Sequence, residues 1–190
     1  MRFLILWSLS VIFCTQLVAK NTSASRYEKQ MSVGMYSLLG WSLGNILVGS
    51  AGSFSSTGSV KHFHQFNVGW NVVNLGLASS GVISLRKKNV TGMETLELFK
   101  EVNKMSKIFL FNAGLDLGYL AAAAFLNERG KARQDDRFIG FGNALMLQGG
   151  FLLVFDLLMY ALVNTNRRSM LNTMSTLAPS SSGLGLVIRF

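Results

Sequence analysis

One apolar segment, KHFHQFNVGWNVVNLGLASSGVISL at residues 61–85, is long enough to cross a bilayer yet carries four polar side chains at helical spacing. These are His64, Asn67, Asn71 and Asn74. Intervals of three or four residues place them on one face of an α-helix. Because an unsatisfied amide in hydrocarbon costs several kcal/mol, this face must turn toward other protein. The segment therefore predicts a bundle of helices with a polar seam.

Three further apolar segments, at residues 31–50, 107–126 and 138–163, are also long enough to span a bilayer. Together with a helix predicted at residues 63–85, they are the candidate membrane spans. The chain has 190 residues, of which 49% are hydrophobic and 14% charged, and one proline. This is the composition of a small membrane protein with a single domain. We therefore predict an all-α fold, a membrane four-helix bundle with a polar interhelical seam, at residues 31–163.

The amino-terminal residues 1–19 have the pattern of a secretory signal peptide. Ala19 is a suitable small residue for cleavage, with Ala24 as a later site, and an uncleaved anchor helix is the alternative. A polar segment, residues 20–30, follows. The only cysteine, Cys14, lies in the predicted signal, so the mature chain would have no cysteine-based metal site.

The segments outside the predicted spans differ in character. Residues 93–106 alternate apolar and charged side chains at helical intervals and predict a short amphipathic helix. Residues 51–62 predict a flexible turn, and residues 127–137 a charged hairpin connection. The polar tail, residues 164–190, ends in GLGLVIRF, which predicts a short strand or, alternatively, a frayed apolar terminus.

Polar side chains on all four spans form the predicted seam. Antiparallel pairing of connected spans places Asn74, Asp116 and Gln148 at a similar depth, with Asn45 nearer the level of Asn67. Asp156 is expected toward the far end of the fourth span, within reach of water. The full set of seam candidates is Asn45, His64, Asn67, Asn71, Asn74, Asn112, Asp116, Gln148 and Asp156.

Two functions fit this seam. In the first, the amides and carboxyls hold the helices together, each hydrogen bond contributing roughly 0.5–2 kcal/mol, and the protein is a structural or interaction subunit. In the second, the seam is a pathway for a small solute or a proton, and Asp116 is the group that binds and releases the proton. The first is our leading prediction and the second the alternative.

Two GxxxG pairs predict close approach between helix backbones. They are Gly40 with Gly44 in the first span, and Gly114 with Gly118 in the third. Small residues four apart remove the side chains that would otherwise hold two membrane helices apart. They have no catalytic meaning.

No motif predicts a metal, a cofactor or an enzymatic activity. His62 and His64 are the only histidines, and two positions apart on a helix they point to different sides. No serine lies in a GxSxG motif, and no phosphate-binding or dinucleotide-binding loop is present. We therefore predict a non-enzymatic protein without cofactor or metal.

The formal net charge of +9 and pI of about 10.1 reflect short basic clusters between the apolar segments. Such clusters are typical of contact with anionic lipid headgroups. The expected partners are therefore the lipid bilayer and a further protein or a second copy of this chain, and not nucleic acid.

The segments GWSLGN, KHFHQFNVGWNVVNLGLA and FNAGLDLGY resemble an uncharacterised family, a domain of unknown function found in small helical membrane proteins of Bacteroidota. The resemblance covers about the first two-thirds of the chain. It implies a bacterial source and a shared fold, and it implies no activity.

The distribution of basic residues conflicts with a simple topology. A cleaved signal followed by four spans puts residues 51–62 and 127–137 in the cytoplasm, yet more Lys and Arg flank the opposite side. Either the first span does not cross the membrane, or the chain is exported past the inner membrane and its helices lie in another part of the envelope. We expect the bacterial cell envelope, with the inner membrane as the default and the outer membrane as the alternative.

Overall fold

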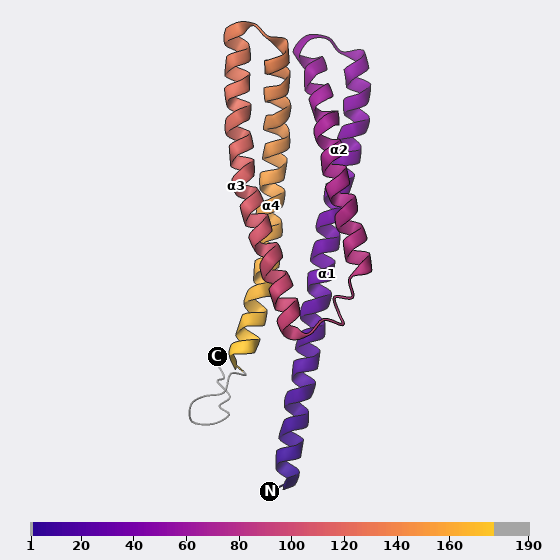
Figure 1. Ribbon diagram of the computed structural model, residues 1–190, viewed down its shortest axis with the longest axis vertical. Coiled ribbons are helices and arrows are strands. Elements are labelled where there is room, and N and C mark those ends of the chain that lie inside the picture. Colours follow the sequence, from indigo (N-terminus) through magenta and orange to yellow (C-terminus); the bar gives the residue numbers. More distant parts are fainter. Residues whose placement is uncertain (1, 177–190) are drawn as a thin grey trace.

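The computed structural model describes the backbone of residues 2–176 and the side chains of residues 22–174. Its elements are four α-helices: α1 (Arg2–Ser55), α2 (Gly58–Lys87), α3 (Thr95–Arg133) and α4 (Asp136–Thr176) (Figure 1). The described backbone contains no strand, so the prediction of an all-α, four-helix fold is confirmed. The strand predicted at the end of the tail lies outside the described residues.

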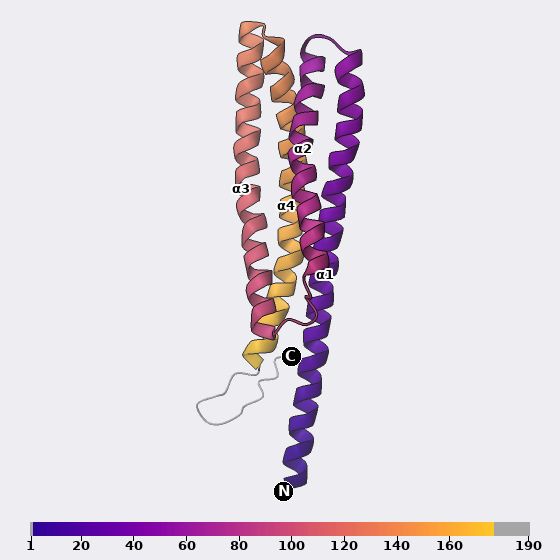
Figure 2. The same ribbon diagram turned by 45° about the vertical axis from the view of Figure 1, so that its right-hand side comes forward.

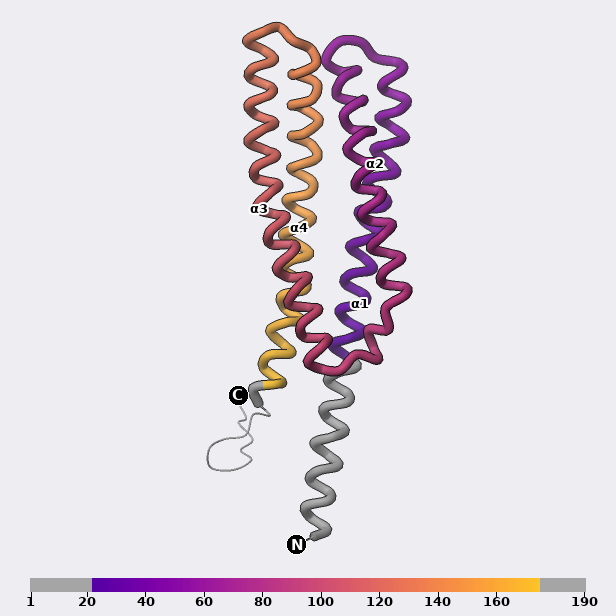
Figure 3. The backbone as a smooth tube through the Cα atoms, viewed as in Figure 1, coloured from indigo at the N-terminus to yellow at the C-terminus, as the bar shows by residue number. Residues whose placement is uncertain are grey.

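Two short turns make two antiparallel hairpins, α1 with α2 and α3 with α4 (Figures 1 and 3). In the first turn, Gly58 has φ +58°, a left-handed conformation that glycine adopts without a steric penalty. In the second, Gln134 caps α3 with φ 54°. The carboxylate of Asp135 then accepts hydrogen bonds from the backbone N–H groups of Arg137 (2.8 Å) and Phe138 (3.3 Å) at the start of α4.

All four helices are long and apolar enough to cross a membrane, which supports an integral membrane protein. They extend beyond the spans predicted from hydropathy, because polar residues continue the helices past their apolar parts. The predicted flexible turn at 51–62 is correspondingly reduced to residues 56 and 57. The short amphipathic helix predicted at 93–106, leading into the third span, is not an element of its own. From Thr95 on, this segment is the beginning of the uninterrupted helix α3.

Helix α4 is the central helix of the bundle and packs against the other three (Figure 2). The two hairpins meet mainly where α2 contacts α4. By contrast, no Cα atom of α2 comes within 8 Å of a Cα atom of α3 in the described part of the chain. The bundle is therefore closed around α4 and left wide between α2 and α3.

The apolar core lies at the end of the bundle that contains the α2–α3 connection. Leu98 and Val102 of α3 pack there against Val163 of α4, all fully buried. At the edge of this core, Glu101 accepts a hydrogen bond from the Tyr27 hydroxyl (3.3 Å) and forms an ion pair with Lys88 (2.8 Å). Apolar packing therefore holds this end together, and the polar seam lies farther along the helices.

The close helix approaches use other glycines than the predicted GxxxG pairs. A Cβ atom added at Gly40, Gly44, Gly114 or Gly118 would meet nothing within 4 Å among the described residues. The prediction that these four glycines allow close helix packing is therefore wrong for the contacts within this bundle. At Gly140 of α4, by contrast, an added Cβ would collide with the Ser59 carbonyl oxygen and lie 2.8 Å from the Phe63 nitrogen. The α2–α4 contact, which joins the hairpins, depends on that glycine.

We expect Gly140→Ala to lower the free energy of unfolding by about 1–3 kcal/mol, because backbone atoms of α2 cannot move aside for a methyl group. Gly114→Ala is the matched control: its methyl group enters open space, and alanine favours the helix by up to about 1 kcal/mol. Denaturant titration of both variants in micelles, followed by circular dichroism, measures the difference. Equal stability of the two variants would contradict the assignment of Gly140 to the helix contact.

Candidate functional site

Four polar side chains form a hydrogen-bonded group, here called the amide layer: Trp41, Asn45, Asn67 and Gln148. The fully buried Gln148 of α4 is its centre. Its carbonyl oxygen accepts a hydrogen bond from Trp41 Nε1 of α1 (3.1 Å). Its amide nitrogen donates to the side-chain oxygens of Asn67 of α2 (2.7 Å) and Asn45 of α1 (3.3 Å). Three helices are thereby joined by side chains that satisfy one another.

Two other seam candidates lie beside the amide layer without joining it. The Asn71 amide nitrogen donates to the backbone oxygen of Asn67 one turn earlier (2.9 Å). The His64 ring lies against Gly52 of α1, near the α1–α2 turn, and packs edge-on against Phe63. Within residues 22–174, no three His, Cys, Asp or Glu side chains come together as metal ligands would. His64 therefore packs against α1, whereas Asn71 bonds within its own helix and its Oδ1 is buried without a partner among the described residues.

The two aspartates of the seam form a pair between α3 and α4. Asp116 is 2% exposed and Asp156 is 4% exposed, and their carboxyl groups lie close enough to interact electrostatically with each other. The Asn112 side chain lies beside Asp156. Because two carboxylates held this close in a buried site repel each other, we expect the pair to hold one proton. The pair with that proton has a net charge of −1.

The positions of Asp156 and Gln148 differ from the expected ones. Asp156 was expected near the water-accessible end of the fourth span, but α4 continues to Thr176 and Asp156 is buried well inside the helix. The turn at residues 134–135 sets the register, which brings Asp156 rather than Gln148 opposite Asp116. Gln148 instead bonds Asn45 and Asn67, so the seam is divided into two groups at different depths.

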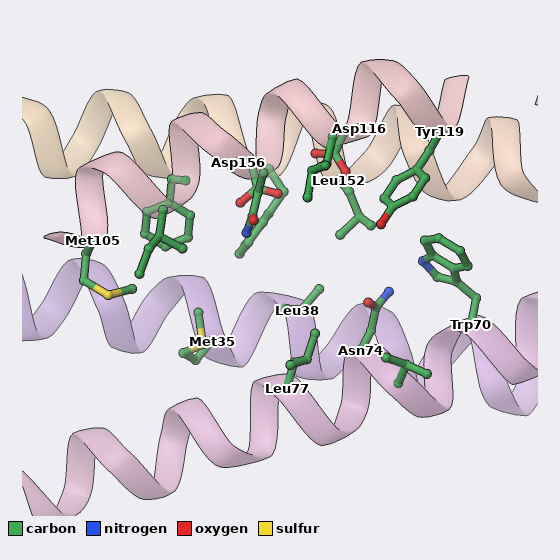
Figure 4. Close-up of a pocket in the computed structure, with 16 residues that line it drawn as sticks. Met35, Leu38, Trp70, Asn74, Leu77, Met105, Asp116, Tyr119, Leu152 and Asp156 are labelled. Atoms are coloured by element: carbon green, nitrogen blue, oxygen red, sulfur yellow. The ribbon is translucent and has the colours of Figure 1, made fainter. Parts of the chain in front are cut away.

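A pocket of about 510 Å³ lies beside the aspartate pair, lined by residues of all four helices. Figure 4 shows the side chains of Asp116, Asp156 and Asn74 around the space between the hairpins, with Trp70 and Tyr119 toward one end. Asn74 is only 5% exposed. The rings of Trp70 of α2 and Tyr119 of α3 pack edge to face, with centroids 5.1 Å apart. This ring pair bridges the two helices whose backbones stay apart.

Several polar atoms around this pocket have no hydrogen-bond partner in the described part of the protein. They are Asn74 Nδ2, Trp70 Nε1 and Asp116 Oδ2. The rest of the lining is largely apolar, and Lys, Arg and His are absent from the described lining residues. Buried polar groups without partners are rare in proteins and costly, which makes them informative. The pocket is therefore the part of the seam equipped to bind something.

A family model, described as a family of unknown function (DUF6992), matches residues 37–157. The chain belongs to this family. The matched region contains the amide layer, the aspartate pair, Asn74 and the Trp70–Tyr119 ring pair. No curated protein matches the chain, and no solved structure does. The DUF6992 region thus contains these polar groups together with Leu98 and Val102 of the apolar core, whereas Val163 lies outside it.

The amide layer contains one donor that sequence reasoning missed, Trp41. Its indole also stacks on Phe151 of α4, with centroids 3.8 Å apart. Tryptophan in an apolar span usually indicates packing or a headgroup contact, so the residue type gives no signal for a bond to Gln148. Only the helix arrangement brings the two side chains together.

We expect Gln148→Leu to lower the free energy of unfolding by about 1–2 kcal/mol, because Trp41, Asn45 and Asn67 all lose a partner. Gln65→Leu makes the same change at an exposed site of α2 and should alter stability little. The unfolding titration used for the glycine variants measures both. A loss no larger for Gln148→Leu than for Gln65→Leu would remove the structural role given to the amide layer.

Proposed function

We propose that this DUF6992 protein is an integral membrane protein that provides a pathway for a proton or a small solute, with the Asp116–Asp156 pair as the proton-binding site. One observation carries the proposal: two buried carboxyl groups lie together beside a pocket whose described lining contains no basic side chain. An ionisable group inside a membrane bundle is expensive and is usually functional. A pair that holds one proton can release it and bind another.

The contrast with the amide layer supports this assignment. Amides that satisfy one another stabilise a bundle, whereas the pocket leaves Asn74 Nδ2 and Asp116 Oδ2 without partners. Tyr119 is the only other titratable side chain among the described lining residues, so no positive charge competes for the carboxyls. The pair therefore keeps its negative charge available to a proton or a cation.

The role of a structural or interaction subunit is the second candidate. It is favoured by the amide layer itself, whose polar groups join three helices. Under this role the aspartate pair is one more link between α3 and α4. A protein partner or a second copy of the chain would then cover part of the exposed apolar surface.

We also propose the bacterial cell envelope as the location, with the inner membrane as the default. The four apolar helices support a membrane location, and the sequence resemblance supports a bacterial source. The end of the bundle with the α2–α3 connection has the larger number of basic residues in the described helices, which favours the cytoplasmic side for that end, opposite to the topology that a cleaved signal predicts.

Proton flux into liposomes tests the proposal. The protein is reconstituted with a trapped pH-sensitive dye, an acid pulse is applied outside, and the membrane potential is clamped with potassium and valinomycin. We expect flux above that of empty liposomes, and we expect Asp116→Asn and Asp156→Asn each to reduce it to that background, because an amide does not exchange the proton.

Glu128→Gln is the matched control, since it removes a carboxyl from an exposed site of α3 and should leave the flux unchanged. Flux in wild type that the two aspartate variants retain would contradict the role of the pair. An absence of protein-dependent flux, with all variants equally folded, would favour the subunit role instead.

A further inference from the structure

The pocket beside the aspartate pair opens on the side of the bundle, between α2 and α3. The backbones of these helices stay more than 8 Å apart at every described Cα pair, and both helices contribute lining residues. In Figure 4 the pocket lies between them, with Leu77 and Asn74 on α2 opposite Asp116 on α3. This opening faces the bilayer if the helices span it.

The rim of the opening is apolar and exposed. Val73 and Leu77 of α2 line the pocket and are 62% and 61% exposed. Ile108 and Leu115 of α3 form the opposite rim and are also exposed. Side chains of this kind are compatible with acyl chains and unsuited to the entry of a hydrated ion.

The inside of the pocket has the opposite character. With one proton between them the two carboxyl groups carry one negative charge, and the described lining provides no basic group to neutralise it. Aromatic rings from Trp70, Tyr119 and Phe109 lie in the same lining. A carboxyl group among aromatic faces is the chemistry that recognises substituted ammonium groups.

A second feature points to a bound polar group. Asn74 is only 5% exposed, and its Nδ2 has no partner among the described residues. The indole N–H of Trp70 on the same helix is likewise buried without a partner in that part of the chain. Both are donors, so they fit an oxygen close to the ammonium of a ligand.

We propose that this pocket binds a cationic amphiphile, a molecule with one substituted ammonium head and one apolar chain, which enters from the bilayer between α2 and α3. The ammonium neutralises the charge of the Asp116–Asp156 pair, and the chain lies along the apolar rim. The proposal rests on the proposed function because it uses the same pair as the site. Phospholipids fit less well, since their phosphate would approach the carboxyls.

Binding of lauroylcholine to the protein in phosphatidylcholine nanodiscs tests the proposal. Lauroylcholine has a quaternary ammonium, an ester oxygen and an apolar chain, and retention of the labelled compound is corrected for empty nanodiscs. We expect one saturable site per protein. Choline, which has the same head without the chain, should bind at least about tenfold more weakly because it buries no chain.

Variants of the pair separate charge from proton exchange. Asp116→Asn and Asp156→Asn each retain one carboxyl and should retain binding, although each should abolish proton flux. The double variant Asp116→Asn/Asp156→Asn removes the charge and should weaken binding about tenfold or more. Binding that survives in the double variant, or dodecyl sulfate bound as tightly as lauroylcholine, overturns the proposal and leaves the flux result untouched.

A bulky side chain placed at the opening tests whether the ligand enters between α2 and α3. Val73→Trp places a large ring on the rim of the pocket, whereas Val72→Trp places it on the preceding residue of α2, which is 56% exposed and lies outside the described lining. We expect Val73→Trp to slow lauroylcholine association severalfold and Val72→Trp to leave it unchanged. Equal rates for the two variants, or choline binding as tight as that of lauroylcholine, overturn lateral entry. These comparisons decide the question even where the double aspartate variant does not fold.

Discussion

The fold depends on one constraint: a polar side chain inside an apolar bundle must find its hydrogen-bond partner on another helix. Gln148 meets this constraint through Trp41, Asn45 and Asn67, and it lies on the helix that contacts all the others. The same α4 brings Gly140 against α2, so the polar and the steric contacts between hairpins reinforce each other. Apolar packing then closes the opposite end around Leu98 and Val163.

The two halves of the seam use similar residue types with different results. In the amide layer, α1, α2 and α4 lie close enough for each amide to reach another. Beside the pocket, α2 and α3 remain apart, so Asn74 Nδ2 has no partner among the described residues, and Asp116 interacts with Asp156 of its own hairpin. Satisfaction of hydrogen bonds, rather than residue type, therefore separates the structural part of the seam from the candidate site.

Periodicity predicted the helices and the inward face of α2, because spacing on a helix fixes which side chains share a face. Asn67, Asn71 and Asn74 are all buried, as that spacing requires. The position of each polar side chain along the bundle axis was harder to predict, since a shift of a few residues in the turn at Gln134 changes which residue of α4 faces Asp116. The partner of Gln148 and the true glycine contacts depend on how the hairpins dock, and this docking has no local signal in the sequence.

The central claim is that Asp116 and Asp156 hold one proton between them inside the bundle. Infrared spectroscopy of the reconstituted protein measures it directly, because a protonated carboxyl group and a carboxylate absorb at different frequencies. We expect a protonated-carboxyl band in the wild type that changes or disappears in Asp116→Asn and in Asp156→Asn, and that stays the same in Glu128→Gln. A wild-type spectrum without that band, or a band that neither aspartate variant alters, would contradict the shared proton and the site built on it.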